Sequence, residues 1–193
     1  MTKKESLLQA AKELFGEHGY NETTFKKISE RAGVALGLLT HHYGNKEKLF
    51  MTAGLDVLEQ LVARLKAAVA GADTGLQAVQ RFCEEYLAFS IDPEENFLVL
   101  IRCSPYSDVK TREDAEVMEE KFTEVYDILE DCVRQGHDDG TIVQYPTKEL
   151  ATNVQCNLVG SVRTRLLTPY SPPSLYDDML QFITRSLTTN KSV

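Results

Sequence analysis

The sequence predicts an all-α protein in which a three-helix N-terminal head is followed by a larger helical bundle. Apolar residues recur three and four positions apart through almost all of the 193 residues, which is the spacing of one helix face. The sequence has no sustained two-residue alternation, although residues 143–145 could be briefly extended. Glycine and proline separate the periodic segments. A hydrophobic content of 42% is enough for a packed core.

The first helix is predicted to begin at a capping box. Thr2 stands at the N-cap and Glu5 at the third helical position, so each side chain can bind a backbone N–H of the other residue. Gly19 is expected to end the helix, because glycine readily adopts the left-handed conformation found after a helix. The apolar stripe between these ends comprises Leu7, Leu8, Ala11, Leu14 and Phe15.

Two short helices are expected next. Thr24 can cap the first of them, whose inward face contains Phe25, Ile28 and Ala32, and Gly33 ends it. The second is expected at residues 35–43, with Leu39 and Tyr43 facing inward and Gly44 after it. Two short helices that meet at a glycine-containing turn form a helix-turn-helix unit, whose second helix can enter the DNA major groove.

A long fourth helix, capped by Asn45, is expected to open the body. We therefore predict a helix-turn-helix domain at residues 1–45 and a second domain at residues 46–193. Breaks at glycine or proline separate the remaining helices. These helices are expected at roughly 76–90, 94–103, 112–135, 147–167 and 174–188.

The charge distribution distinguishes the two ends of the chain. The formal net charge is −8, which by itself disfavours nucleic acid. Residues 1–50, however, contain eight Lys or Arg and six Asp or Glu, so the acidic excess lies entirely in the remainder. Such asymmetry directs attention to the N-terminal end as a nucleic-acid-binding candidate. The outer face of the helix-turn-helix offers donors for phosphates, namely Lys26, Lys27, Thr40, His41, His42 and Lys46.

Several classes of site are disfavoured by the sequence. No apolar run approaches the length of a membrane span, and Met-Thr-Lys-Lys-Glu lacks the apolar segment of a signal peptide, so we expect a cytoplasmic protein without membrane contact. His41 and His42 diverge by about 100° on a helix and serve one metal ion poorly. No metal or cofactor is expected. Cys83, Cys103, Cys132 and Cys156 are interpreted as small core residues, with a redox-sensing thiol as the alternative.

The head resembles that of TetR-family regulators. The resemblance rests on Phe15-x-x-x-Gly19-Tyr20, on Thr23-Thr24, on the Ile28-to-Val34 turn, and on His42-Tyr43 followed by Lys46-x-x-Leu49, without a gap from residue 15 to residue 50. Residues 136–140 and 146–151 of the body resemble the family too. The resemblance implies a homodimer that binds a palindromic double-stranded DNA operator and responds to a small-molecule effector.

The resemblance also implies which residues meet DNA. Thr24, Lys26, His42 and Lys46 match positions that contact phosphate, and Lys46 can share a phosphate with the N-terminus of the fourth helix. Residues at or near the bases are Ala35, Leu36, Gly37, Leu38, Thr40 and His41. The chain departs from the family pattern, which often has Ser at 35, Thr at 38 and Tyr at 40. Ala35 cannot cap the third helix with its side chain, at a cost of about 1 kcal/mol, and Leu36 and Leu38 offer methyl contacts suited to thymine.

Two further sets of residues are predicted in the body. The resemblance implies that the last two helices form the dimer interface, and each carries one apolar stripe, although these stripes could instead face the protomer's own core. The predicted interface residues are Val154, Leu158, Val162, Leu166, Met179, Leu180, Ile183 and Leu187. The predicted effector pocket contains Phe82, Tyr86, Phe89, Arg102, Tyr106, Phe122, Tyr126, Asn153 and Asn157, although aromatic residues at helical spacing are commonly core.

The expected function is therefore a sequence-specific DNA-binding transcriptional regulator, a repressor released from its operator by a small molecule. The sequence has no glycine-rich phosphate loop, zinc spacing or nucleophile motif, which argues against an enzyme. The alternative is a helical adaptor that binds protein and never DNA, and it would show no salt-sensitive DNA binding. The identity of the effector, the operator sequence and the regulated genes cannot be read from these residues.

Overall fold

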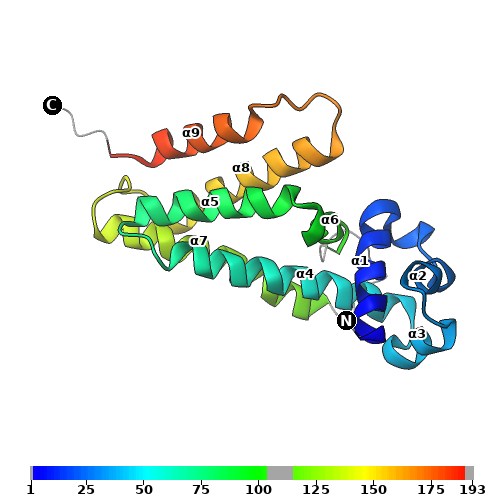
Figure 1. The fold of residues 1–193 in the computed structure, drawn as a ribbon. Helices are drawn as coiled ribbons and strands as arrows, with labels where there is room; N and C mark the ends of the chain where they lie inside the picture. Colours follow the sequence, from blue (N-terminus) through cyan, green and yellow to red (C-terminus); the bar gives the residue numbers. More distant parts are fainter. Residues whose placement is uncertain (1, 104–114, 190–193) are drawn as a thin grey trace. The chain divides into compact units, whose positions relative to one another are not determined.

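The computed structural model describes residues 2–103 and 115–189, and its regular elements there are helices (Figure 1). A single isolated bridge pairs Ile142 with Thr188. The prediction of an all-α fold is confirmed. In chain order the elements are α1 (Lys3–Glu22), α2 (Phe25–Ala32), α3 (Leu36–Tyr43), α4 (Lys46–Val69), α5 (Gly75–Ile91), the short 3₁₀ helix η1 (Pro93–Glu95), α6 (Leu98–Cys103), α7 (Ala115–Asp138), α8 (Thr147–Leu167) and α9 (Leu175–Leu187).

The chain forms two compact units. The first combines residues 1–60 with 92–122, and the second combines residues 61–91 with 123–193. The first unit therefore contains α1 to α3 together with the start of α4 and with α6, a segment that comes much later in the sequence. The functional boundary between residues 45 and 46 stays a prediction.

In the first unit, α1 packs against α2, α3 and α6. The capping box at its start is confirmed: Thr2 N donates to Glu5 Oε2 at 2.8 Å, and Glu5 N donates to Thr2 Oγ1 at 3.2 Å. The prediction that Gly19 ends the helix is wrong. Gly19 has φ 77° and ψ 177°, and the helix resumes after this kink and ends at Glu22.

The two short helices α2 and α3 meet at the predicted turn. Thr24 caps α2, and Gly33 ends it in the left-handed conformation, with φ 64° and ψ 31°. Ile28, Leu39 and Tyr43 are buried, so their side chains fix the angle between the helices. Ala35 stands at the N-cap of α3 without a side-chain hydrogen bond, as predicted.

Helix α4 begins where Asn45 Oδ1 accepts a hydrogen bond from Lys48 N at 2.9 Å, so the predicted cap is present. The ammonium of Lys12, on α1, binds Asp56 Oδ2 on α4 at 2.9 Å. The Lys12 side chain is almost fully buried, and a buried cation needs such a partner because water cannot solvate it. This ion pair ties α1 to the first half of α4.

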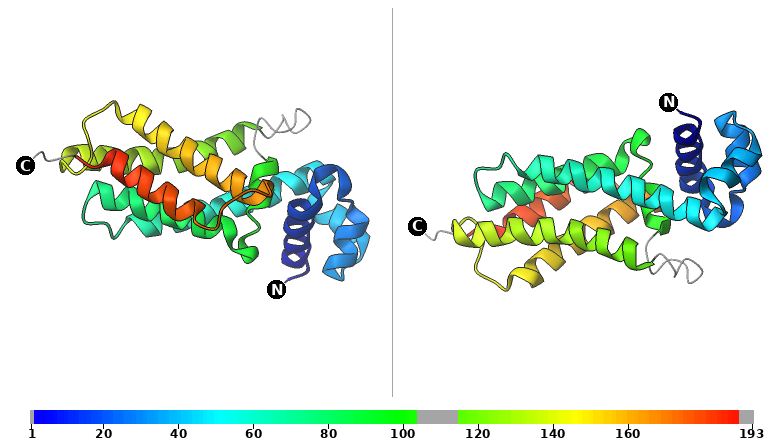
Figure 2. Two further views of the ribbon diagram at one scale, coloured as in Figure 1. Left: turned by 90° about the horizontal axis from the view of Figure 1, so that it is seen from above. Right: turned by 90° about the horizontal axis from the view of Figure 1, so that it is seen from below.

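In the second unit, α5 packs against both α8 and α9, which also contact each other (Figure 2, where α8 runs from yellow to orange and α9 is red). The loop between α7 and α8 caps the start of α5: Gly75 N donates to Asp139 Oδ2 at 2.7 Å, and Leu76 N donates to Thr141 Oγ1 at 3.2 Å. A Cβ at Gly75 would lie 1.9 Å from Gly136 N, so only glycine fits there.

One predicted helix is divided in two. Instead of a helix over residues 94–103, the chain forms η1 and then α6. Asn96, with φ 55° and ψ 35°, separates them. A left-handed residue cannot continue a right-handed helix, and asparagine tolerates this conformation better than most side chains.

The cysteines divide by environment. Cys83 and Cys132 are buried, and burial raises the pKa of both thiols, that of Cys132 to about 11, with the nearby Asp131 charge adding to the shift. Cys156 is exposed on α8, so its interpretation as a core residue is wrong. The side chain of Cys103 lies outside the described residues. Thiols held protonated by burial react slowly.

Across residues 2–103 and 115–189, no helix is both long and apolar enough to cross a membrane. Within the same residues, no group of three or more His, Cys, Asp or Glu side chains is placed to hold a metal ion.

Candidate DNA-binding surface

Helix α3 is held by one face and leaves the opposite face free. Leu39 and Tyr43 are buried beneath it, and the Tyr43 hydroxyl donates to the carbonyl of Lys4 at 3.0 Å. Burial raises the pKa of Tyr43, and the nearby charge of Asp56 adds to the shift, so this hydroxyl stays a donor. Two anchors therefore position a helix of eight residues.

The predicted base-reading residues lie mostly on the free face of α3. Leu36 is 49% exposed, so a large part of its apolar side chain is accessible. Gly37 is also exposed, and a Cβ there would have no heavy atom within 4 Å. Leu38 is half-buried and so presents less of its side chain. The remaining members of the set, Ala35, Thr40 and His41, are exposed.

The predicted phosphate contacts on α2 are accessible. The Thr24 hydroxyl accepts a hydrogen bond from Lys27 N at 3.2 Å and keeps its own proton to donate. The Lys26 side chain is 79% exposed, with Glu30 at 3.9 Å as a loose ion-pair partner. The third cation of this helix, Arg31, is directed elsewhere, because its guanidinium binds Glu13 and Glu17 of α1.

The two histidines lie at the end of α3. Both are exposed, and their rings meet edge to face with centroids 5.3 Å apart. Imidazole N–H groups at this position are free to bind the backbone of a nucleic acid, which is the role predicted for His42.

Lys46 differs from the other predicted phosphate contacts. Its ammonium donates to the carbonyl of Tyr20 at 2.9 Å and to that of Thr23 at 3.1 Å. It also lies 4.1 Å from the centroid of the Tyr20 ring. Two of the three N–H donors of the ammonium are therefore engaged within the head, and the predicted phosphate contact stays a prediction.

Among the described residues predicted for an effector pocket, Phe82 and Tyr86 lie together with their rings stacked, and several others lie elsewhere. Phe82, Tyr86 and Phe89 are buried in the core along α5, and burial, with the nearby Tyr176, raises the pKa of Tyr86. Arg102 belongs to the first unit, where its guanidinium lies against the kink in α1: a Cβ at Gly19 would be 2.3 Å from Arg102 Nη1. This placement corrects the prediction for Arg102. Phe122 also belongs to the first unit, and Tyr106 lies outside the described residues.

The three polar members of that set serve local structure. The Tyr126 hydroxyl donates to the carbonyl of Lys148 at 3.0 Å and so ties α7 to α8. Asn153 and Asn157 donate to carbonyls four residues earlier in their own helix. These bonds lie at the surface, so the prediction that the three residues line an internal pocket is wrong.

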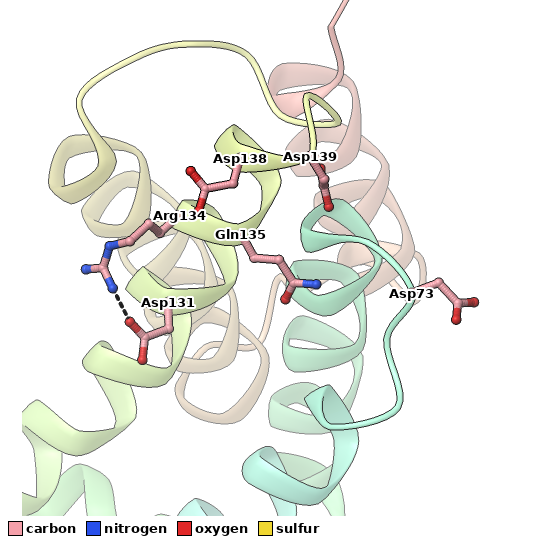
Figure 3. Close-up of a pocket in the computed structure, with 6 residues that line it drawn as sticks. All are labelled: Asp73, Asp131, Arg134, Gln135, Asp138 and Asp139. Carbon is pink, nitrogen blue, oxygen red and sulfur yellow. Dashed lines mark hydrogen bonds and ion pairs between the residues drawn. The ribbon is translucent and has the colours of Figure 1, made fainter.

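A shallow pocket does lie in the second unit, and it has none of the predicted residues in its lining (Figure 3). Its volume is about 470 Å³, and four aspartates, Arg134 and Gln135 surround it. Arg134 is paired with Asp131 and Glu130, and Asp139 is engaged with Gly75 and Thr141. The sequence offered no signal for this pocket because Asp73 lies far from the others along the chain.

The predicted dimer-interface stripes are mostly core. Six of the eight side chains are 0–7% exposed within the chain itself: Val154, Leu158, Val162, Met179, Ile183 and Leu187. Leu166 and Leu180 are half-buried. A side chain already covered by its own chain has little surface left for a partner, so the alternative interpretation of these stripes is correct. The outward faces of the same helices carry other apolar or small residues, namely Cys156, Gly160, Leu167 and Phe182.

These geometries define a class of protein. It is a helical molecule with a helix-turn-helix whose second helix exposes one face, and this is the arrangement that contacts the bases of DNA.

The family model for bacterial regulatory proteins of the tetR family matches residues 7–52. The HTH-type transcriptional repressor AcnR of Corynebacterium efficiens is 30% identical over 131 residues, which span 68% of this chain and 62% of that protein. AcnR of Corynebacterium glutamicum is 27% identical over 177 residues, spanning 89% and 86%.

Solved structures show the same fold. A transcriptional regulator from Saccharomonospora viridis in complex with choline has a TM-score of 0.83 at 15% identity and covers 96% of this chain and 97% of that one. FadR from Bacillus subtilis in complex with stearoyl-CoA has a TM-score of 0.78 at 18% identity and covers 95% and 98%. The chain belongs to the TetR family, whose members are DNA-binding transcription regulators and not enzymes.

Proposed function

We propose that this chain is a homodimeric repressor that binds a palindromic double-stranded DNA operator in the cytoplasm and leaves it when a small molecule binds. The observation that carries the proposal is the free face of α3, where a leucine, a glycine, a threonine and a histidine are exposed together. Such a face fits the major groove, in which methyl and hydrogen-bonding groups of the bases are accessible.

The proposed contacts divide into two kinds. Thr24, Lys26 and His42 would bind phosphates and set the register of the head on the duplex. Leu36, Gly37, Thr40 and His41 would face the bases, with Ala35 at the start of the helix and Leu38 contributing its exposed part. Leu36 suits a thymine methyl group because its side chain is apolar and the residue is 49% exposed.

Two heads are needed for tight binding, because one helix-turn-helix covers few base pairs. We propose that the second copy docks on the outward faces of α8 and α9. Phe182 is 60% exposed and Leu167 is 47% exposed. At Gly160 a Cβ would have no heavy atom within 4 Å, so a partner helix can approach closely there. Burying these apolar groups between two copies removes them from water, which favours association.

Release by a small molecule is proposed for the body. Regulators with this fold have been solved with choline and with stearoyl-CoA, so a body of this architecture can hold ligands of very different size. The buried aromatic residues of α5, namely Phe82, Tyr86 and Phe89, remain the proposed lining. A ligand that weakens DNA affinity by some factor must itself be bound more weakly, by the same factor, when DNA is present.

The test begins with selection of duplexes of about 30 base pairs from a random library, which spans two half-sites one helical turn apart. We expect one palindromic sequence to be enriched and its affinity to fall steeply with salt, because phosphate contacts release counterions. Fluorescence anisotropy measures both quantities. An absence of salt-sensitive binding to any duplex would overturn the proposal and favour the helical adaptor instead. Metabolite fractions of a host extract that lower the anisotropy would identify the effector.

A further inference from the structure

The first turn of α1 is tied to the end of α3. The hydroxyl of Tyr43, the last residue of α3, donates to the carbonyl of Lys4 at 3.0 Å, and the Tyr43 side chain is almost fully buried. This bond reaches the backbone of Lys4 and leaves its ammonium group available. Residues 3 and 4 are therefore held at the edge of the candidate DNA-binding surface, next to the helix that carries its exposed face.

Two lysines stand in this turn, and no carboxylate neutralises them. Lys3 and Lys4 are both exposed, and in the part of the chain that the structure describes neither of them forms an ion pair. Glu5, the acidic residue beside them, serves the capping box, where its Oε2 accepts a hydrogen bond from Thr2 N at 2.8 Å. An exposed ammonium on a flexible stem, without a carboxylate partner, keeps its charge for an anion that approaches from solvent.

Several other cations of the first unit are already engaged with the protein. Lys12 binds Asp56 at 2.9 Å, and the guanidinium of Arg31 binds two glutamates of α1. Lys27 Nζ donates to the carbonyl of Glu22 at 2.8 Å. The positive balance of residues 1–50 therefore depends on few lysines without a carboxylate partner, and two of these are adjacent in the first turn of α1.

The place of this turn favours a backbone phosphate over a base as its ligand. In a helix-turn-helix bound to DNA, the N-terminal residues of the second helix contact the base edges. The opposite end of α3, to which Lys4 is tied, then lies toward the wall of the groove, which is sugar and phosphate. The two ammonium groups provide the attraction, since the N-terminal N–H groups of Thr2 and Glu5 are used by the capping box.

We propose that Lys3 and Lys4 form a second phosphate-binding site of the head, which contacts the DNA backbone beside the end of α3 and is separate from the contacts of α2. This inference rests on the proposed function, since it extends the DNA-binding surface of the same head. The site adds affinity without reading sequence, because every base pair presents the same phosphates.

The test compares the double variant Lys3→Gln/Lys4→Gln with the control Lys148→Gln, which removes an exposed lysine from the second unit. The double variant keeps Thr2, Glu5 and the carbonyl of residue 4, so the capping box and the bond from Tyr43 should persist. Circular dichroism checks the fold. Affinities are measured by anisotropy as a function of salt on the duplex selected by the wild-type protein and on a scrambled duplex of equal composition.

For the double variant we expect the slope of log affinity against log salt to become shallower by roughly 2–4 per dimer, since each lost phosphate contact releases about 0.9 fewer counterions. The ratio of selected to scrambled affinity should stay near that of the wild type. Lys148→Gln should keep both the slope and the ratio. A folded double variant with the wild-type slope would overturn the inference.

Acylation of lysine amines gives a second test on the unaltered chain. Modification by an N-hydroxysuccinimide ester is followed by mass spectrometry with and without the selected duplex. We expect the rates at Lys3 and Lys4 to fall severalfold when DNA is bound, and the rate at Lys148 to stay the same. Equal rates at the two lysines with and without DNA would overturn the inference. Failure of the proposed function would appear instead as an absence of salt-sensitive binding by the wild-type protein to any duplex.

Discussion

Helices α3 and α8 use their apolar residues in opposite ways. In α3, two buried side chains hold the helix, and a large apolar residue, Leu36, is left in solvent. In α8, the apolar stripe that includes Val154, Leu158 and Val162 is buried in the core of its own unit. A short helix supported by neighbours can present apolar groups to a partner, whereas a long bundle helix first has to cover its own core. The same kind of stripe therefore has a different meaning in the two regions.

The largest effect that tests this contrast is expected for Leu158→Asp. The side chain is 0% exposed within one chain, so the variant buries a carboxylate without a partner. We expect destabilisation of roughly 3–5 kcal/mol and loss of helical circular dichroism at moderate temperature. An intact, fully helical monomer would show instead that Leu158 belongs to an interface between copies, as the stripe first suggested.

Phe182→Asp is the matched change on the outward face of α9. Because the phenylalanine is 60% exposed, we expect the helical content to persist while light scattering detects monomers at micromolar concentration. Cys156 gives an independent measurement, because a short bismaleimide should link two wild-type copies through this exposed thiol. Cys156→Ser is the control. A Phe182→Asp protein that remains dimeric and still cross-links would exclude this face as the interface.

A smaller effect is expected for Thr40→Ala on the free face of α3. The side chain is exposed, so its removal should leave thermal stability within about 0.5 kcal/mol of the wild type. Operator affinity should fall by about 1–3 kcal/mol through particular base pairs. The salt slope should not change. Equal weakening on every duplex would place Thr40 on the phosphate backbone.

The smallest effect is expected for Asp139, whose pKa is lowered by the hydrogen bond from the Thr141 side chain and by the N–H groups of Gly75 and Thr141. A carboxyl with a lowered pKa stabilises the fold above its unfolded pKa of about 3.9. That contribution is lost as the pH falls through the folded value. Urea unfolding should show Asp139→Asn less stable than the wild type near pH 7, with the gap closing below about pH 4. A gap independent of pH would exclude the linkage.

Local signals in the head were read correctly from the sequence because both partners of each contact lie close together along the chain. The capping box of Thr2 and Glu5 and the caps at Thr24 and Asn45 are of this kind. The end of α1 was not predicted. The helix continues beyond Gly19 because Thr23 and Lys46 satisfy carbonyls there, and Lys46 is brought to that point only by the fold.

The body was predicted less well because periodicity identifies an apolar face without saying what covers it. Leu158 and Ile183 are predicted at the dimer interface, but both are covered by their own chain. Tyr126 is predicted in a pocket from its residue type and the family resemblance, but its hydroxyl joins two helices at the surface. Contacts between residues far apart in sequence, such as Gly75 with Asp139, leave no mark in a single sequence.

Gly37 has a consequence for how this protein can change over time. Gly37 lies on the free face of α3. Its φ is not positive, unlike that of Gly33 or Gly44, so its backbone does not require glycine, and a Cβ there would have no heavy atom within 4 Å. Alanine in place of glycine inside a helix adds about 1 kcal/mol of stability. A lineage could therefore alter its operator preference at this residue in a single mutational step without losing the fold, so new regulatory targets become reachable through variants that all remain foldable.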